Sequence, residues 1–326
     1  MAGDGIEGVI LVRYIFGPVP SRRLGLSLGV DIVPFKTCSF DCIYCQLGRT
    51  TCKTIIRDSF VSFETIVNEL KGVLPKVTAN YITFSGSGEP TLNLDLGRLI
   101  REAKELTSIP VAVLTNSSLF GYPEVRRELL DADLVVPSLD AASQEVFGGI
   151  NRPYPGLKVN DIIHGIKAFS SDFGGKLWIE VMLVKGVNDD ERELARISSA
   201  LKGINAEKIQ LNTVERPPAE SFAKPLTEDE MERIKSYFDE RVEVITAPNN
   251  RQTSIGQPTA EEEEKDMKAE YDRILNLLKR RPCTLADVAS GLGLNMNEAS
   301  KYLGILLRLG LINVDNSASG KTYFHG

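Results

Sequence analysis

Three cysteines stand close together in the segment KTCSFDCIYCQLG: Cys38, Cys42 and Cys45, with the spacing C-x3-C-x2-C. Three thiolates from one loop can bind three irons of a cubane [4Fe–4S] cluster and leave the fourth iron without a protein ligand. An open coordination position is typical of a site that does chemistry. A zinc site or unligated thiols are the alternatives, but zinc would need a fourth ligand, and Cys52 and His164 do not match the required spacing. We therefore predict one cluster, with these three cysteines as its metal ligands and as the catalytic centre.

Polar residues also follow two apolar runs further along the chain. The segment MLVKGVND carries Lys185 and Asn188, and QLNTVERPPAE carries Gln210, Asn212 and Arg216. Buried polar side chains at the ends of apolar strands are unfavourable unless they contact a ligand or each other. We therefore expect these residues to face a substrate or a cofactor.

Two neighbouring arginines, Arg22 and Arg23, lie in the segment FGPVPSRRLG. Guanidinium groups bind carboxylate and phosphate with paired hydrogen bonds, although exposed paired arginines are also common. We treat Arg22 and Arg23, together with Asn212 and Arg216, as possible substrate or anion contacts. The NRP sequence at Asn151 is a further unusual polar loop.

Short β-branched runs alternate with helical patterns from about residue 29 to 246, and this alternation predicts the elements that position the polar residues. Such alternation favours a parallel sheet with right-handed crossovers, either open or closed into a barrel. In sheets of this kind the functional loops lie at the carboxyl ends of the strands. The predicted strands are Gly29–Pro34, Tyr81–Phe84, Val111–Leu114, Leu134–Val136, Leu177–Val184, Ile209–Leu211 and Val242–Ile245.

We assign residues 1–246 to a first domain, with residues 1–28 as its N-terminal extension, and the composition changes after residue 246. Residues 247–260 are rich in Pro, Asn, Gln, Ser and Thr without periodicity, which indicates a linker. Residues 261–326 show three helical patterns and two short strand candidates, and they resemble a winged helix-turn-helix domain. From Met267 onward the chain has 8 Lys and Arg against 5 Asp and Glu, so this part carries +3 while the whole chain carries −6. The opposite sign suggests an anionic partner, but a recognition helix with only Lys301 and Arg308 is poor in bases, so a nucleic acid and a protein both stay open.

The cysteine motif resembles that of the radical S-adenosylmethionine (radical SAM) superfamily, which has the pattern C-x3-C-x-aromatic-C with Tyr44 at the aromatic position. The resemblance covers residues 15–245 and implies an α/β fold, a partial (β/α)6 TIM-like barrel. It also implies that S-adenosylmethionine binds the open iron and is cleaved to a 5′-deoxyadenosyl radical that abstracts a substrate hydrogen. The segments FGPVPSRRLG, CIYCQLGRT and LNTVERPP look like a poorly characterised Fe–S oxidoreductase group. That group lies near the molybdenum-cofactor cyclase, nitrogenase-cofactor and wyosine tRNA-modifying branches.

The same resemblance assigns cofactor contacts residue by residue. The segment SGSGEPTL is similar to the superfamily's GGEP segment, which holds the methionine amino group, and glycines there let the main chain approach a ligand closely. Taken alone, that segment would be a plain glycine turn, and the Ser and Asp of PSLDA would serve equally well as caps of the next helix. The implied cofactor-binding residues are Tyr44, Gly86, Gly88, Glu89, Asn116, Ser138, Asp140 and Asn188.

Composition places further limits on function. The chain has 326 residues, 42% of them hydrophobic and 25% charged, which excludes disordered, collagen-like and disulfide-scaffold classes. Five cysteines, no secretory signal and no long apolar stretch predict a cytoplasmic protein that does not enter a membrane. Cys52 and Cys283 do not supply a second cluster.

Two functional hypotheses follow from these observations. The first is a radical SAM enzyme that receives its electron from a ferredoxin- or flavodoxin-type donor and acts on an RNA, a protein or a small molecule. The second is an Fe–S redox sensor that binds DNA through the winged helix. The glycine-rich segment and the polar strand ends favour the enzyme, because a sensor needs no cofactor cradle.

Overall fold

The computed structural model describes residues 14–245, 262–294, 296–317 and 321–326 of the chain. One eight-stranded sheet dominates the fold, in the order β1-β2-β5-β6-β7-β8-β9-β10. Every neighbouring pair is parallel except β1 and β2, which are antiparallel. The strands are β1 (Ile15–Ser21), β2 (Gly25–Val30), β5 (Tyr81–Phe84), β6 (Val111–Thr115), β7 (Leu134–Pro137), β8 (Lys176–Leu183), β9 (Lys208–Thr213) and β10 (Val242–Val244).

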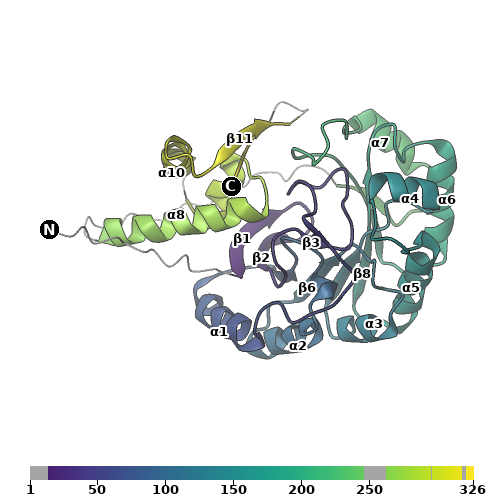
Figure 1. Ribbon diagram of the computed structural model, residues 1–326, viewed down its shortest axis with the longest axis horizontal. Helices are drawn as coiled ribbons and strands as arrows, with labels where there is room; N and C mark the ends of the chain where they lie inside the picture. Colours follow the sequence, from purple (N-terminus) through teal and green to yellow (C-terminus); the bar gives the residue numbers. More distant parts are fainter. Residues whose placement is uncertain (1–13, 246–261, 295, 318–320) are drawn as a thin grey trace.

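Helices connect the parallel strands and follow one another round the outside of the curved sheet (Figure 1). Side chains on both faces of the strands are fully buried, Leu28 and Val113 among them, as expected for a parallel sheet covered on one side and closed on itself on the other. This is the partial (β/α)6 barrel that the resemblance implies. The helices are α1 (Phe63–Val73), α2 (Leu96–Leu106), α3 (Pro123–Leu129), α4 (Gln144–Ile150), α5 (Val159–Asp172), α6 (Glu191–Lys202) and α7 (Glu228–Lys235).

The first strand differs from its predicted range of 29–34. The parallel strand β2 ends at Val30, and the apolar residues that follow continue as a buried loop. Pro34 has no amide hydrogen to donate to a neighbouring strand, so it cannot extend the ladder. Residues 15–21, which we predicted only as part of an N-terminal extension, form the edge strand β1. This strand packs closely on β2 because Gly29 leaves room for the Phe16 ring. A Cβ on Gly29 would lie 2.1 Å from the Phe16 Cζ.

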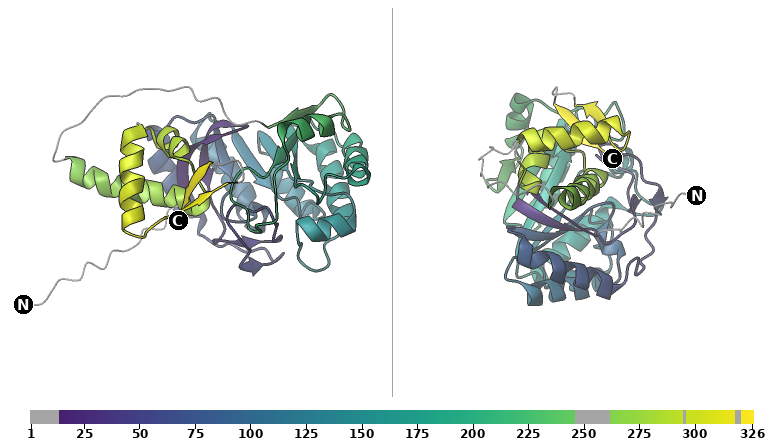
Figure 2. Two further views of the ribbon diagram at one scale, coloured as in Figure 1. Left: turned by 90° about the horizontal axis from the view of Figure 1, so that it is seen from above. Right: turned by 90° about the vertical axis from the view of Figure 1, so that its left-hand side faces the viewer.

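The C-terminal part contains three helices and an antiparallel hairpin, in the predicted order. They are α8 (Glu262–Arg280), α9 (Leu285–Leu292), α10 (Met296–Arg308), β11 (Asn313–Asn316) and β12 (Thr322–His325). Figure 2 shows them gathered at one end of the molecule, beside β1. The predicted linker 247–260 lies outside the described residues.

The C-terminal part shares its hydrophobic core with the edge strand of the barrel. Phe16 and Val19 of β1 are buried together with apolar residues of α8, α9 and α10, such as Ile274 and Leu303. Close approach is needed here too, since a Cβ on Gly291 would lie 3.0 Å from the Pro18 carbonyl oxygen. The two parts of the chain therefore form a continuous interface along β1.

A buried ion pair joins α8 to the end of β2. The Arg280 Nε lies 3.0 Å from Oδ2 of Asp31, with 10% and 5% of the two side chains exposed, and the guanidinium also lies over the Phe16 ring. Ser87 donates to the same carboxylate through its amide and its hydroxyl. Asp31 thus ties the loop after β5 to the C-terminal part.

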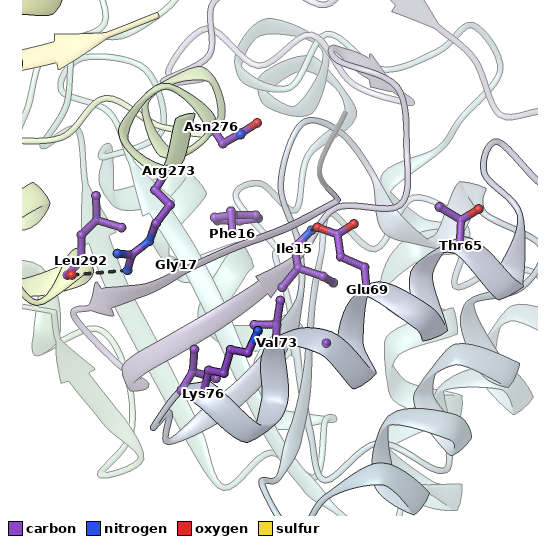
Figure 3. Close-up of a pocket in the computed structure, with 12 residues that line it drawn as sticks. Ile15, Phe16, Gly17, Thr65, Glu69, Val73, Lys76, Arg273, Asn276 and Leu292 are labelled. Carbon is purple, nitrogen blue, oxygen red and sulfur yellow. Dashed lines mark hydrogen bonds between the residues drawn. The ribbon is translucent and has the colours of Figure 1, made fainter. Parts of the chain in front are cut away.

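A cavity of about 760 Å³ remains between β1, α1 and α8 (Figure 3). Glu69 on α1 accepts hydrogen bonds from the amides of Tyr14 and Ile15, and Arg273 of α8 donates to the neighbouring Leu292 carbonyl at one side of the cavity. None of its lining residues belongs to the cysteine segment or to the loops at the carboxyl ends of β5 to β9.

Replacing Arg280 should destabilise the protein strongly. Arg280→Gln leaves the buried Asp31 carboxylate without its cation, and losing one partner of a buried pair typically costs about 3–5 kcal/mol. Urea unfolding of the full chain measures this free energy. The control is Arg101→Gln, which removes an exposed pair with Asp131 and should cost at most about 1 kcal/mol. Equal losses in the two variants would contradict the prediction.

Candidate cluster and cofactor site

The three cysteines lie on one loop that begins at the short strand β3 (Thr37–Cys38), which pairs with β4 (Cys52–Lys53). The buried side chains of Phe40 and Ile43 anchor this loop on the barrel, and the Ile43 amide donates to the Ile150 carbonyl at 3.0 Å. The cysteine side chains themselves are partly exposed and unpaired with one another. The loop is therefore fixed by its backbone and its apolar residues, which leaves the thiols available.

Each of the three sulfurs receives a hydrogen bond from a nitrogen of an amide or ammonium side chain. The Nδ2 of Asn116 lies 3.4 Å from the Cys38 Sγ, and the Nδ2 of Asn151 lies 3.5 Å from the Cys42 Sγ. Lys36 donates its ammonium to the Cys45 Sγ at 3.1 Å. Sequence reasoning placed Asn116 at the site, singled out Asn151 without a role, and missed Lys36.

Burial makes the thiolate form unfavourable in the absence of a cation. It raises the pKa of Cys38 to about 12, with a further contribution from the Glu89 carboxylate, and it raises the pKa of Cys42 well above its ordinary value. A bound metal reverses this balance, because a coordinating thiol is deprotonated outright. Within the described ranges no three His, Cys, Asp or Glu side chains are arranged to hold a single metal ion. The donor set, three thiols each facing an N–H donor, suits a cluster in which each cysteine binds a different iron.

Lys36 adopts a backbone conformation that is uncommon for a residue with a side chain. Its φ is +58°, and the residue is only 4% exposed. Three hydrogen bonds hold this conformation: its amide donates to the Ser87 carbonyl at 2.8 Å, and its carbonyl accepts from the amides of Thr51 and Cys52. A non-glycine residue in this region is strained and persists where its surroundings enforce it, which is common at functional sites.

Glu89 lies fully inside the protein, next to the cysteine loop. Its Oε1 accepts from the Thr91 amide, the Thr91 hydroxyl and the Thr115 hydroxyl, and its Oε2 accepts from the Asn116 amide at 2.7 Å. Burial raises its pKa and these donors lower it, with a net increase. A carboxylate has about four lone-pair sites, so Oε2 has capacity for one more donor.

The two glycines of the loop after β5 allow close contacts within the protein. A Cβ on Gly88 would lie 1.8 Å from the Thr37 carbonyl oxygen, and a Cβ on Gly86, whose φ is +149°, would lie 2.6 Å from the Asp31 Cγ. We expected these glycines to let the main chain approach a ligand. The structure shows that they let it approach the cysteine strand and the Asp31 carboxylate.

Tyr44, Asp140 and Asn188 meet in one buried network. The Tyr44 hydroxyl and the Nδ2 of Asn151 both donate to Asp140 Oδ2, and the Met182 amide donates to its Oδ1 at 2.9 Å. Asn188 donates to the carbonyls of Asp140 and Met182, so it fixes the backbone. Burial raises the pKa of Asp140 to about 6 in spite of the hydrogen bonds.

Ser138 and Asp140 do not cap the following helix. Ser143 is the N-cap of α4 and accepts a hydrogen bond from the Val146 amide, which removes the alternative role considered for them. The backbone of Ser138 bonds to β6 through Thr115, and its side chain has no hydrogen-bond partner in the described part of the chain. Asn116, Ser138 and Asp140 line the same small pocket next to Phe40.

Glu180 of β8 draws together two of the predicted substrate contacts. The Arg23 Nη1 lies 2.8 Å from its Oε1, and the Nδ2 of Asn212 donates to the same oxygen at 2.9 Å. Burial alone would raise the pKa of Glu180, but Arg23, Asn212 and the charge of Arg22 together outweigh burial and hold this pKa below its usual value. Sequence reasoning missed Glu180. Arg23 and Asn212 are therefore bound to a carboxylate of the protein itself.

The remaining predicted polar residues lie in different places. The Nη1 of Arg216 donates to the Gln46 side chain at 2.9 Å, directly after the cysteine motif. Lys185 forms an exposed ion pair with Glu230, away from the cysteine loop. Gln210 of β9 donates to Glu243 of β10.

Comparison with known proteins is consistent with this geometry. A family model described as the radical SAM superfamily matches residues 32–197. A UPF0026 protein of Helicobacter pylori is 35% identical over 315 residues, which are 95% of this chain and 96% of that protein. A protein named GTPase Obg, from Brachyspira hyodysenteriae, is 38% identical over 92% of this chain, but the chain spans only 43% of its length. Among solved structures, TYW1 with a lysine-pyruvate adduct is similar in fold, with a TM-score of 0.51 and 19% identity over 70% of this chain and 76% of TYW1.

Adding a methyl group at Gly88 should separate the cysteine strand from the loop after β5. We expect Gly88→Ala to lower the melting temperature of the protein. It should also reduce the amount of iron and sulfide that binds during anaerobic reconstitution. The reason is that the Thr37 carbonyl cannot move away from the new methyl group without breaking its hydrogen bond from the Glu89 amide. Gly72→Ala on α1 is the control, since its Cβ would meet nothing within 4 Å. It should stabilise the protein by roughly 0.5–1 kcal/mol. Full iron loading of Gly88→Ala would contradict the proposed contact.

Proposed function

The chain belongs to the radical SAM superfamily, and on that premise we propose that it cleaves S-adenosylmethionine reductively and starts a radical reaction on a substrate of its own. Enzymes of this superfamily use a [4Fe–4S] cluster and S-adenosylmethionine and generally need an external electron donor. When held by Cys38, Cys42 and Cys45, a reduced cluster would supply the electron for cleavage of S-adenosylmethionine, and the cleaved cofactor would supply the chemistry for abstraction of a hydrogen atom from the substrate.

The observation that carries the proposal is the set of three half-buried thiols, each with one N–H donor, on a loop fixed against the carboxyl ends of the strands. Cys38, Cys42 and Cys45 would hold three irons. Hydrogen bonds to cluster sulfurs and nearby charges raise or lower the reduction potential of such a site. Lys36 is therefore the residue we expect to influence this property most, since it brings a full positive charge to Cys45.

The remaining residues of the site would bind and orient the cofactor. The free lone pair of Glu89 Oε2 suits an ammonium donor, and the Ser138 hydroxyl lies unused in the pocket beside Asp140. Tyr44 and Asn151 hold Asp140 in one orientation. The fully buried apolar side chains of the sheet would exclude water from a reactive intermediate.

A DNA-binding redox sensor is less well supported. Such a sensor would have no use for the buried Glu89 and Asp140 carboxylates around the cysteine loop. Strand β11 exposes Asn313, Val314 and Asp315, and so offers no cation to a phosphate backbone. We keep a protein or nucleic acid contact as the proposed role of the C-terminal part, and a ferredoxin- or flavodoxin-type protein as the proposed electron donor. No helix among the described residues is long and apolar enough to cross a membrane.

The cofactor chemistry can be tested directly. Anaerobically reconstituted protein, reduced with dithionite and mixed with S-adenosylmethionine, should release 5′-deoxyadenosine, measured by liquid chromatography. Cys42→Ala should lose both the cluster and the cleavage. Cys52→Ala is the matched control and should retain both, because Cys52 is exposed and lies outside the motif. An intact cluster that gives no cleavage with any reductant would rule the proposal out.

The charge of Lys36 should raise the reduction potential of the cluster, because a nearby cation favours the more negative, reduced state. We expect Lys36→Met to lower the potential by tens of millivolts, where about 59 mV corresponds to a tenfold change for one electron. The readout is a redox titration followed by electron paramagnetic resonance. Lys36→Arg should restore the potential, and Lys53→Met, which removes an exposed lysine of the same loop, should leave it unchanged. A potential that is the same in Lys36→Met would refute this role.

A further inference from the structure

Three arginines from distant parts of the chain lie close together where the C-terminal part meets the barrel. They are Arg22 in the turn between β1 and β2, Arg216 in the loop after β9, and Arg281 directly after α8. Arg281 donates through Nη1 to the Pro20 carbonyl at 3.2 Å, which brings it to the β1–β2 turn. We call Arg22, Arg216 and Arg281 the arginine cluster.

A second contact fixes the loop that carries Arg216. The preceding residue, Glu215, accepts hydrogen bonds from Lys321 and from the Tyr323 hydroxyl of the C-terminal hairpin. Arg216 itself donates to Gln46, which follows Cys45 in the chain. The arginine cluster therefore lies beside the cysteine loop and is enclosed by both parts of the protein.

The positive charge of the arginine cluster is poorly satisfied. The Nε of Arg216 and the Nη2 of Arg281 are buried without a hydrogen-bond partner, and only 11% of the Arg281 side chain is exposed. Among the residues that the structure describes, Arg22 forms no hydrogen bond and no ion pair. Arg23 differs, because Glu180 neutralises it at 2.8 Å.

The nearby carboxylates have other partners. Glu215 is engaged by Lys321, as described above. Asp287 lies 3.7 Å from the Arg281 Nη2, but its Oδ2 accepts from the Thr284 amide and closes the capping box of α9. Neither carboxylate makes a hydrogen bond to a guanidinium of the arginine cluster.

Burial and mutual repulsion disfavour the charged form of two of the three arginines. Burial and the charges of Arg281 and Arg22 lower the pKa of Arg216 to about 10. The pKa of Arg281 itself is raised, because Cys283 and Asp287 act against burial. Burial and the charge of Arg23 likewise lower the pKa of Arg22. Buried charges are costly unless they are paired. An anion would provide the missing partner.

We propose that Arg22, Arg216 and Arg281 bind the phosphate group of a small-molecule substrate and so anchor that substrate beside the cysteine loop. That the bound molecule is a substrate rests on the proposed function, whereas the anion site is argued from the geometry of the arginines alone. Several guanidinium groups with free N–H donors match the charge and the oxygens of a phosphate better than those of a single carboxylate.

The burial of the guanidinium nitrogens favours a small molecule over a polymer. An RNA backbone would need an open groove along the site, but Arg281 is enclosed by Pro20, Cys283 and the hairpin. A cleft of about 270 Å³ lies between the cysteine loop and the C-terminal part, and Gln46, Pro217 and Asp315 are among the residues that line it. The cleft begins one residue beyond Arg216, and the three arginines lie outside its lining, so a ligand of the arginine cluster would enter from this side.

The test uses the full chain, reconstituted and kept oxidised, with inorganic pyrophosphate as the probe. Isothermal titration calorimetry should detect binding, and pyrophosphate should raise the melting temperature. Arg216→Gln and Arg281→Gln should each weaken binding at least tenfold. Arg101→Gln, which removes an exposed arginine far from the site, should bind like the wild type.

A second readout separates anion binding from a structural role. Without pyrophosphate, Arg216→Gln should melt at the same temperature as the wild type or higher, because it relieves repulsion. If it melts lower and binds pyrophosphate normally, the arginine cluster is structural and the proposal is wrong. Absence of binding to the wild type would also overturn it.

Two further probes test the nature of the ligand. If citrate binds more tightly than pyrophosphate, the ligand carries carboxylates and the phosphate proposal is wrong. If a single-stranded RNA without a terminal phosphate binds through the same arginines, the ligand is a polymer and the small-molecule proposal is wrong.

Failure of the anion site and failure of the proposed function give different results. Release of 5′-deoxyadenosine without pyrophosphate binding rejects only the site. Pyrophosphate binding without S-adenosylmethionine cleavage rejects only the reaction.

Discussion

Two backbone hydrogen bonds hold the cysteine loop against the loop that follows β5: the Lys36 amide donates to the Ser87 carbonyl, and the Glu89 amide donates to the Thr37 carbonyl. The contact is possible only because Gly88 has no side chain. The positions of the other residues at the site depend on this contact between the two loops. It brings the Glu89 carboxylate next to Cys38, and it turns Lys36 into the strained conformation from which its ammonium reaches Cys45.

The same junction extends to the C-terminal part through one acidic side chain. Asp31 accepts from Ser87 on one side and lies against Arg280 on the other, and it is almost fully buried. The residue that follows Arg280 is Arg281 of the arginine cluster. The contact between Arg280 and Asp31 therefore fixes both the C-terminal part and the proposed anion site. The Asp31 carboxylate therefore couples the loop after β5 to the end of α8, and Arg281 couples the end of α8 to the turn before β2.

The features that could be predicted from the sequence alone are those encoded by neighbouring residues. The cysteine motif and the strands Tyr81–Phe84 and Val111–Leu114 are short stretches whose chemistry or periodicity is contained in neighbouring residues, and the structure matches those strands within one residue. Lys36, Glu180 and Arg281 could not be assigned in this way. Lys36 acquires its role from Cys45, which lies 9 residues further along the loop, and Arg281 acquires its role from Pro20, which lies 261 positions away. The edge strand β1 was missed for the same reason, since its burial depends on α8 and α9.

The shared core of β1 and the C-terminal helices has a consequence for the order of folding. A chain synthesised from its N-terminus exposes Phe16 and Val19 long before Ile274 and Leu303 leave the ribosome. Until then β1 is an uncovered edge strand, which is a template for pairing with other chains. The barrel can collapse around its own core in the meantime, but the lateral edge stays open through most of synthesis. Closure of this edge therefore comes last, when the final helices dock on β1.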